Sequence, residues 1–102
     1  MTNYLFVYYD GKQPASADEG KEVMGDWDNW FKSLGKSLVD GGSPTSPGRL
    51  VTPTGVKKIG ANPVTGYTVV KADNLDAAAA IAKSGPHLAS GGQIAVYACM
   101  QM

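Results

Sequence analysis

The fold of this chain is decided by its opening stretch, Asn3-Tyr4-Leu5-Phe6-Val7-Tyr8-Tyr9, which ends at the turn pair Asp10-Gly11. Aromatic and β-branched residues dominate the stretch, so it predicts a β-strand. Alternate residues of a strand point to opposite faces, and here both sets are apolar. A sheet with one solvated face would not tolerate this, so we expect a central strand that is covered on both sides.

Two helices are expected downstream of this strand. The first begins at the capping box Ser16-x-x-Glu19 and ends at Gly41-Gly42. Its apolar stripe has helical spacing and comprises Val23, Trp27, Trp30, Phe31, Leu34 and Leu38. The second is predicted over Leu75 to Ser84, with a cap from Asp73-Asn74 and a stop at Gly85-Pro86. Its expected buried stripe is Leu75, Ala78, Ile81 and Ala82.

The remaining strands are predicted around a segment rich in turn residues. Residues 41–66 hold four of the six prolines, yet Arg49 to Val51 and Val56 to Ile59 could pair as an edge hairpin across Pro53-Thr54-Gly55. Tyr67 to Ala72 and Gln93 to Met100 are expected to be strands of the main sheet.

This order predicts an α+β, ferredoxin-like βαββαβ fold: a four-stranded antiparallel sheet with two helices on one face. The first and third strands are expected at its centre. The other face is expected to carry Tyr4, Phe6, Tyr8, Tyr67, Val69 and Tyr97. A monomer rarely exposes so aromatic a patch, so the sequence predicts a homodimer.

Length and charge narrow the functional classes. The 102 residues suffice for a single domain over 1–102, and nine basic residues balance nine acidic ones. Nucleic acid and membrane surfaces are therefore not expected as partners. No apolar run is long enough for a signal core or a membrane span, and a single cysteine excludes an intrachain disulfide. A cytoplasmic location is expected.

No cofactor or metal motif stands out. The chain has one histidine and one cysteine, so no zinc spacing exists, and no metal site is expected. Gly35-Lys36-Ser37 imitates the end of a phosphate-binding loop, but the glycine required five residues earlier is Trp30. We therefore expect no cofactor.

His87 and Asp26 are the catalytic candidates. His87 follows a helix stop, where its imidazole could reach a cleft between helices and sheet; an exposed loop histidine is the plain alternative. Asp26 or Asp28, which flank Trp27, could orient it, although both could equally be solvated carboxylates.

Trp27, Trp30 and Arg49 are the ligand-binding candidates. Arg49, with Lys57 and Lys58, gives the hairpin a basic character that suits a small anionic ligand, although lysines also protect a solvated edge strand. The two tryptophans fit a core, or one wall of a pocket.

The chain resembles the YCII-related family, including its DGPF-type branch, which comprises small dimeric α+β barrel proteins. The resemblance spans most of the chain and rests on Tyr4-Leu5-Phe6-Val7-Tyr8, Trp27 to Leu34, Leu38 to Gly42, Gly66 to Val70, Ala72 to Ala78, and Gly91 to Val96. It implies a dimeric α+β barrel.

Two departures from that family limit what is carried over. Gly60 to Thr65 stands where the DGPF branch has its Asp-Gly-Pro-Phe signature. The YCII branch is thought to use a histidine near the first helix with an aspartate, and this helix has Asp26 but no histidine. No catalytic role is transferred, so His87 is a candidate from its own position only.

Together these features predict a small homodimer that binds a small molecule in a cleft near the first helix and the His87 loop. Whether it is an enzyme stays open. The alternatives are a non-catalytic dimerisation or interaction module and, by fold analogy, a cofactor-free monooxygenase-like protein.

Overall fold

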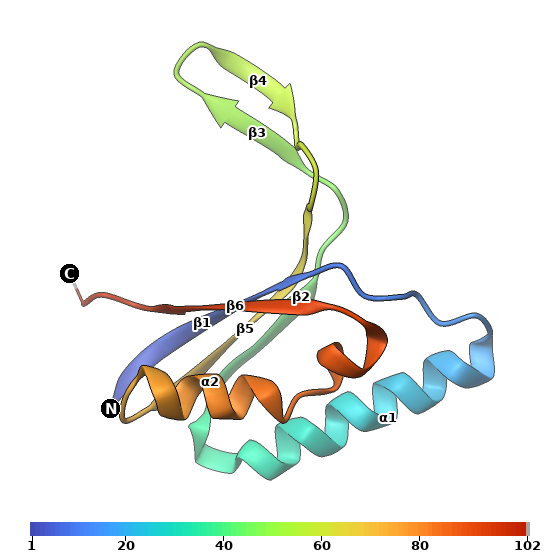
Figure 1. Cartoon of the computed structure of the whole chain (residues 1–102), viewed down its shortest axis with the longest axis vertical. Coiled ribbons are helices and arrows are strands. Elements are labelled where there is room, and N and C mark those ends of the chain that lie inside the picture. The colour runs from blue at the N-terminus through green and yellow to red at the C-terminus, as the bar shows by residue number, and fades with distance from the viewer. Residues whose placement is uncertain (102) are drawn as a thin grey trace.

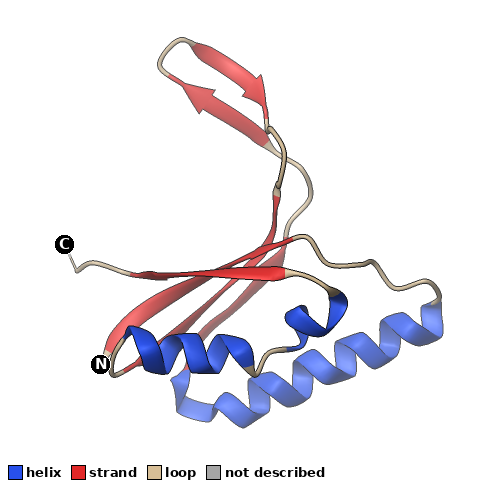
Figure 2. Cartoon of the chain, viewed as in Figure 1, coloured by secondary structure: helices blue, strands red, loops and turns tan. Residues whose placement is uncertain are grey.

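A four-stranded antiparallel sheet carries both helices on one face (Figures 1 and 2). The computed structural model describes residues 1–101. Its elements are β1 (Thr2–Tyr9), α1 (Ala17–Leu34), β2 (Leu38–Pro44), β3 (Arg49–Thr52), β4 (Gly55–Lys58), β5 (Val64–Ala72), α2 (Leu75–Lys83) and β6 (Gln93–Ala98). Two short 3-10 helices, η1 (Gly35–Ser37) and η2 (Pro86–Ser90), follow α1 and α2 respectively.

The main sheet has the strand order β2-β5-β1-β6, so β1 and β5 are central, as predicted. Phe6 pairs with Thr68 of β5 and with Val96 of β6. The α+β, ferredoxin-like architecture is therefore confirmed.

Both helices begin at the predicted caps. The Ser16 side chain accepts a hydrogen bond from the Glu19 amide at 3.1 Å, and the Asn74 side chain accepts one from the Ala77 amide at 2.8 Å. These bonds satisfy backbone donors that have no partner within the helix.

The predicted end of the first helix is wrong. The helix ends at Leu34, Gly35 caps it with φ of +54°, and Leu38–Pro44 forms the edge strand β2. Backbone pairing with β5 prevails over the helical spacing of Leu38. Gly42 permits this path, because its φ is +73° and an added Cβ would overlap the Tyr67 carbonyl.

The predicted hairpin forms, with Arg49 opposite Lys58 and Val51 opposite Val56. It is not an edge of the main sheet, however, but a separate two-stranded sheet that projects from the body (Figure 1). Its apolar residues Leu50, Val51 and Val56 are exposed.

The faces of β1 are assigned oppositely to the prediction. Tyr4, Phe6 and Tyr8 are buried under the helices with Trp30, Val70, Ala72, Ala78 and Ala82. Leu75 of α2, expected in this core, is 52% exposed.

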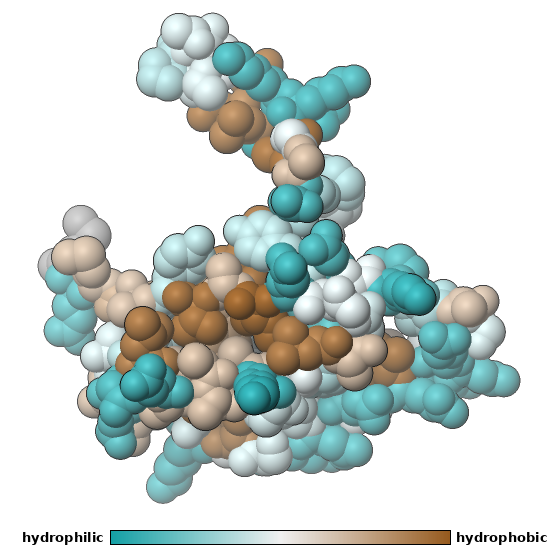
Figure 3. Space-filling view, in the orientation of Figure 1, coloured by the Kyte–Doolittle hydropathy of each residue, from teal (hydrophilic) through white to brown (hydrophobic). Residues whose placement is uncertain are grey.

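The open sheet face is apolar, but it comes from the other alternation. By strand register it comprises Leu5, Val7, Tyr9, Tyr67, Val69, Ala95 and Tyr97. Tyr67, Val69 and Tyr97 thus lie where predicted. Figure 3 shows a further hydrophobic band over β6, and hydrophobic residues beside hydrophilic ones on the hairpin.

Within residues 1–101, no helix is long and apolar enough to cross a membrane.

Candidate functional site

His87 lies in η2, the short turn that connects α2 to β6. Pro86 starts this turn, and Gly91, with φ of +84°, ends it. His87 is only 9% exposed, so the alternative of an exposed loop histidine is excluded. The loop after β1 packs on the same turn, since the Lys12 amide donates to the Ser90 carbonyl at 2.9 Å.

One hydrogen bond determines the protonation of the imidazole. His87 Nε2 lies 2.7 Å from the backbone carbonyl oxygen of Tyr9. A carbonyl oxygen can only accept, so Nε2 carries the proton, and in the neutral ring Nδ1 keeps its lone pair. Among residues 1–101, the buried side-chain polar atom without a hydrogen-bond partner is Thr65 Oγ1, so the unbonded Nδ1 is not fully buried. The site therefore fixes Nε2 on the Tyr9 carbonyl, whereas Nδ1 makes no hydrogen bond within residues 1–101.

Two glycines make room for this ring. A Cβ on Gly92 would overlap the imidazole around Nε2. A Cβ on Gly11 would lie 3.0 Å from His87 Cε1 and 2.8 Å from Ser90 Oγ. Backbone thus encloses the ring on two sides. A side chain at Gly92 would meet His87 first, whereas one at Gly11, where φ is +92°, would meet both Ser90 and His87.

Tyr8 links His87 to the aromatic residues of α1. Its ring centroid is 4.9 Å from that of His87 and 5.3 Å from that of Trp27. Its hydroxyl donates to Thr68 Oγ1 at 2.7 Å, and Thr68 in turn donates to the Gly41 carbonyl. Burial raises the pKa of Tyr8 to about 12, and the Thr68 hydrogen bond opposes this shift. Tyr8 therefore keeps its hydroxyl proton near neutral pH, and it packs between His87 and Trp27 without acting as a base.

The two predicted tryptophans differ in exposure. Trp30 is buried, and its Nε1 donates to Ser84 Oγ at 3.0 Å, which ties α1 to the end of α2. Trp27 is half-buried and lies edge-on to both Tyr8 and Trp30. Of the pair, Trp27 has surface left for a ligand.

Asp26 is exposed on α1 and makes no hydrogen bond to His87. The partner that orients the imidazole is instead the Tyr9 backbone. The structure thus brings His87 together with Tyr8 and, through it, with Trp27, but no carboxylate within residues 1–101 forms a hydrogen bond with His87.

Arg49 does not lie with His87 and the tryptophans. It lines a cavity of about 380 Å³ at the foot of the hairpin, together with Tyr9, Thr45, Ser46, Gly48, Ile59, Asn62, Pro63 and Val64. Neither this cavity nor a second one beside the chain ends, described below, is lined by His87 or the tryptophans.

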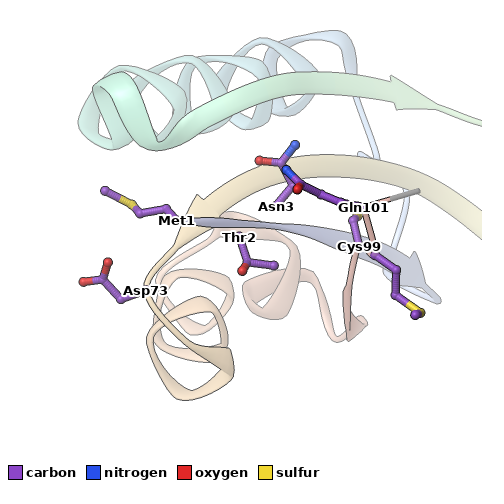
Figure 4. Close-up of a pocket in the computed structure, with 7 residues that line it drawn as sticks. Met1, Thr2, Asn3, Asp73, Cys99 and Gln101 are labelled. Carbon is purple, nitrogen blue, oxygen red and sulfur yellow. The ribbon is translucent and has the colours of Figure 1, made fainter.

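A second cavity, of about 560 Å³, lies beside the chain ends (Figure 4). Met1 and Asp73 lie at one end of it, and Asn3, Cys99 and Gln101 at the other. The labelled side chains do not converge on a common point. Cys99 is exposed here.

Within the described chain, no three His, Cys, Asp or Glu side chains are grouped as metal ligands would be.

The sequence pattern did not reveal the residues that hold His87. Gly11, Gly92, Ser90 and the Tyr9 carbonyl contribute backbone or small side chains, which carry no chemical signature. The sequence feature that could have indicated a closely packed histidine is the pair Gly91-Gly92, a few residues after His87.

Comparison with known proteins supports the fold. The chain is similar to the 5-chloro-2-hydroxyhydroquinone dehydrochlorinase TftG from Burkholderia phenoliruptrix, solved in complex with 2,5-dihydroxybenzoquinone. The TM-score is 0.57 at 15% identity, over 96% of this chain and 95% of the other. At this identity the likeness shows a shared α+β fold. No protein-family model and no curated sequence matches the chain, so the YCII resemblance stays a prediction.

Proposed function

We propose that this protein is a homodimer that binds a small planar organic molecule, with His87 as the group that exchanges a proton with it. The observation that carries the proposal is the 2.7 Å hydrogen bond from His87 Nε2 to the Tyr9 carbonyl. Proteins commonly orient a working histidine by this kind of bond, which leaves the second nitrogen as the base.

The proton transfer follows from the tautomer. Nδ1 accepts a proton from an acidic O–H or C–H group of the ligand, whose electron pair stays behind as an enolate. The imidazolium then donates two hydrogen bonds, from Nε2 to the Tyr9 carbonyl and from Nδ1 to the ligand anion, and the Nδ1 proton is the one that can return to the ligand. The activity for which TftG is named, dehydrochlorination of a hydroxylated ring, is chemistry of this class.

Trp27 supports a planar ligand. It is half-buried and fixed by edge contacts to Tyr8 and Trp30, so it offers a rigid aromatic surface next to the Tyr8–His87 pair. Asp26, on the exposed side of the same helix, takes no part in the proposed transfer.

The single histidine makes the test direct. Long-range ¹⁵N NMR of the imidazole should show a protonated Nε2 and an unprotonated Nδ1. Titration with 2,5-dihydroxybenzoquinone should shift Nδ1 in the natural protein and in Asp26→Asn. Binding should weaken in His87→Gln, which keeps an amide donor but has no base. A protonated Nδ1, or His87 signals that are unchanged at millimolar probe, would contradict the proposal.

Dimerisation is proposed through the open sheet face. Val7 and Val69 lie near its middle on the two central strands, and Tyr97 on β6 is 54% exposed. An exposed apolar face of this kind is typical of a surface that a second copy covers.

Light scattering on two variants tests the dimer. Val7→Asp places a charge at the centre of the face and should give monomers. Met24→Asp, at an exposed apolar position of α1, should remain dimeric. A natural protein that is monomeric at micromolar concentration would refute dimerisation.

The same apolar face favours a second candidate function, that of a non-catalytic interaction module. This candidate requires dimers to form while the NMR titration above leaves His87 unaffected.

A further inference from the structure

We propose that the cavity at the foot of the β3–β4 hairpin binds a small aromatic carboxylate, with the Arg49 guanidinium holding the carboxylate. His87 does not line this cavity, although Tyr9, whose carbonyl accepts the His87 hydrogen bond, does. The proposal goes beyond the function proposed above. Its volume of about 380 Å³ lies within the range of roughly 300–1,000 Å³ that is usual for small-molecule sites.

The charge around the cavity selects an anion. Arg49 is the charged residue among those that line it. Residues 41–72 contain no aspartate or glutamate, although the whole chain has equal numbers of acidic and basic residues. The hairpin therefore carries three local positive charges, from Arg49, Lys57 and Lys58, without a neutralising carboxylate in its own segment.

The guanidinium has donors to spare. Arg49 Nη1 donates to the Gly48 carbonyl at 3.0 Å, and this is the hydrogen bond that its side chain makes within residues 1–101. A guanidinium has five N–H donors in a planar fork, and two parallel ones match the two oxygens of a carboxylate. The bond to Gly48 holds the side chain at the cavity without using up the fork.

The rest of the lining favours an aromatic body on the ligand. Tyr9, Ile59 and Pro63 are half-buried apolar residues, and Val64 adds a fourth apolar side chain. Asn62 supplies a neutral amide at the same cavity, in a left-handed conformation with φ of +62°. A cavity lined by apolar side chains and one cationic fork suits a molecule with a flat apolar ring and a single anionic group.

Benzoate is the probe, and two analogues separate its parts. Benzamide keeps the ring but is neutral, and acetate keeps the charge but lacks the ring. Calorimetric titration of the natural protein should show benzoate binding more tightly than either analogue. Amide shifts in the NMR spectrum should map benzoate to Gly48 and Asn62.

The variants compare two cations of one hairpin. Arg49→Gln should weaken benzoate binding about tenfold or more, because a charge-assisted hydrogen-bond pair is lost. Arg49→Lys keeps the charge but not the fork and should be intermediate. Lys57→Gln removes the same charge outside the cavity lining and should change the affinity less than about twofold.

Three outcomes would overturn the proposal: equal losses in Arg49→Gln and Lys57→Gln, benzamide binding as tightly as benzoate, or amide shifts away from the cavity. These results would leave the His87 proposal unaffected. That proposal is tested by ¹⁵N NMR of the imidazole and by titration with 2,5-dihydroxybenzoquinone, not with benzoate.

Discussion

Replacing Gly92 by alanine should displace the buried histidine. The added Cβ would overlap the imidazole around Nε2, and Gly92 itself has no left-handed φ that would strain an alanine. The ring must move, and the hydrogen bond to the Tyr9 carbonyl is lost. The lost bond costs about 0.5–1.5 kcal/mol, and overpacking adds about 1–3 kcal/mol. We expect a total loss of about 1.5–4.5 kcal/mol from the free energy of unfolding.

A double-mutant cycle isolates the physical cause. In His87→Ala the obstructing ring is gone, so adding Gly92→Ala should cost less than about 0.5 kcal/mol more. The coupling between the two sites is then about 1 kcal/mol or more, as expected for residues in direct contact. Urea unfolding followed by tryptophan fluorescence measures each corner of the cycle. All four proteins need one fixed concentration, because the apparent stability of the proposed dimer would depend on concentration.

The reasoning fails if Gly92→Ala costs the same in both backgrounds. That result would mean that the glycine serves the backbone of β6 and not the histidine. It would also remove the structural argument for a fixed His87 tautomer.

Three further results are expected. Between pH 10 and 12 the natural protein should lose about 2 kcal/mol of stability relative to Tyr8→Phe, as measured by urea unfolding. The reason is that Tyr8 loses its proton from about pH 10 in the unfolded chain, whereas in the folded protein its pKa is raised to about 12. Deprotonation therefore favours the unfolded state as the pH rises. Trp30→Ala should cost about 3–5 kcal/mol and the half-buried Trp27→Ala clearly less, and equal costs would contradict the difference in burial. In thermal unfolding, Gly25→Ala, where an added Cβ meets open space in a helix, should stabilise by about 0.5–1 kcal/mol, whereas Gly42→Ala should destabilise strongly.

Local features of the fold were predictable because they depend on neighbouring residues. The caps at Ser16 and Asn74 need only a side chain and an amide three residues later. The hairpin pairing of Arg49 to Lys58 follows from a short turn between two extended segments. The two-sided apolar pattern of residues 4–9 likewise placed β1 at the sheet centre.

Tertiary structure decided which side of β1 is inside. Because both alternations are apolar, the period of the sequence contains no information on which set faces the helices. Leu38 shows the same limit: its spacing fits α1, but pairing with Val70 makes it part of a strand. Non-local backbone pairing outweighs a local helical pattern.

The candidate site shows most clearly what the sequence determined and what it did not. The sequence singled out His87, since it is the one histidine of the chain. Its burial, its tautomer and its orienting partner depend on a carbonyl 78 residues away. Every residue has such a carbonyl, so only the packing of η2 against the end of β1 selects the one at Tyr9.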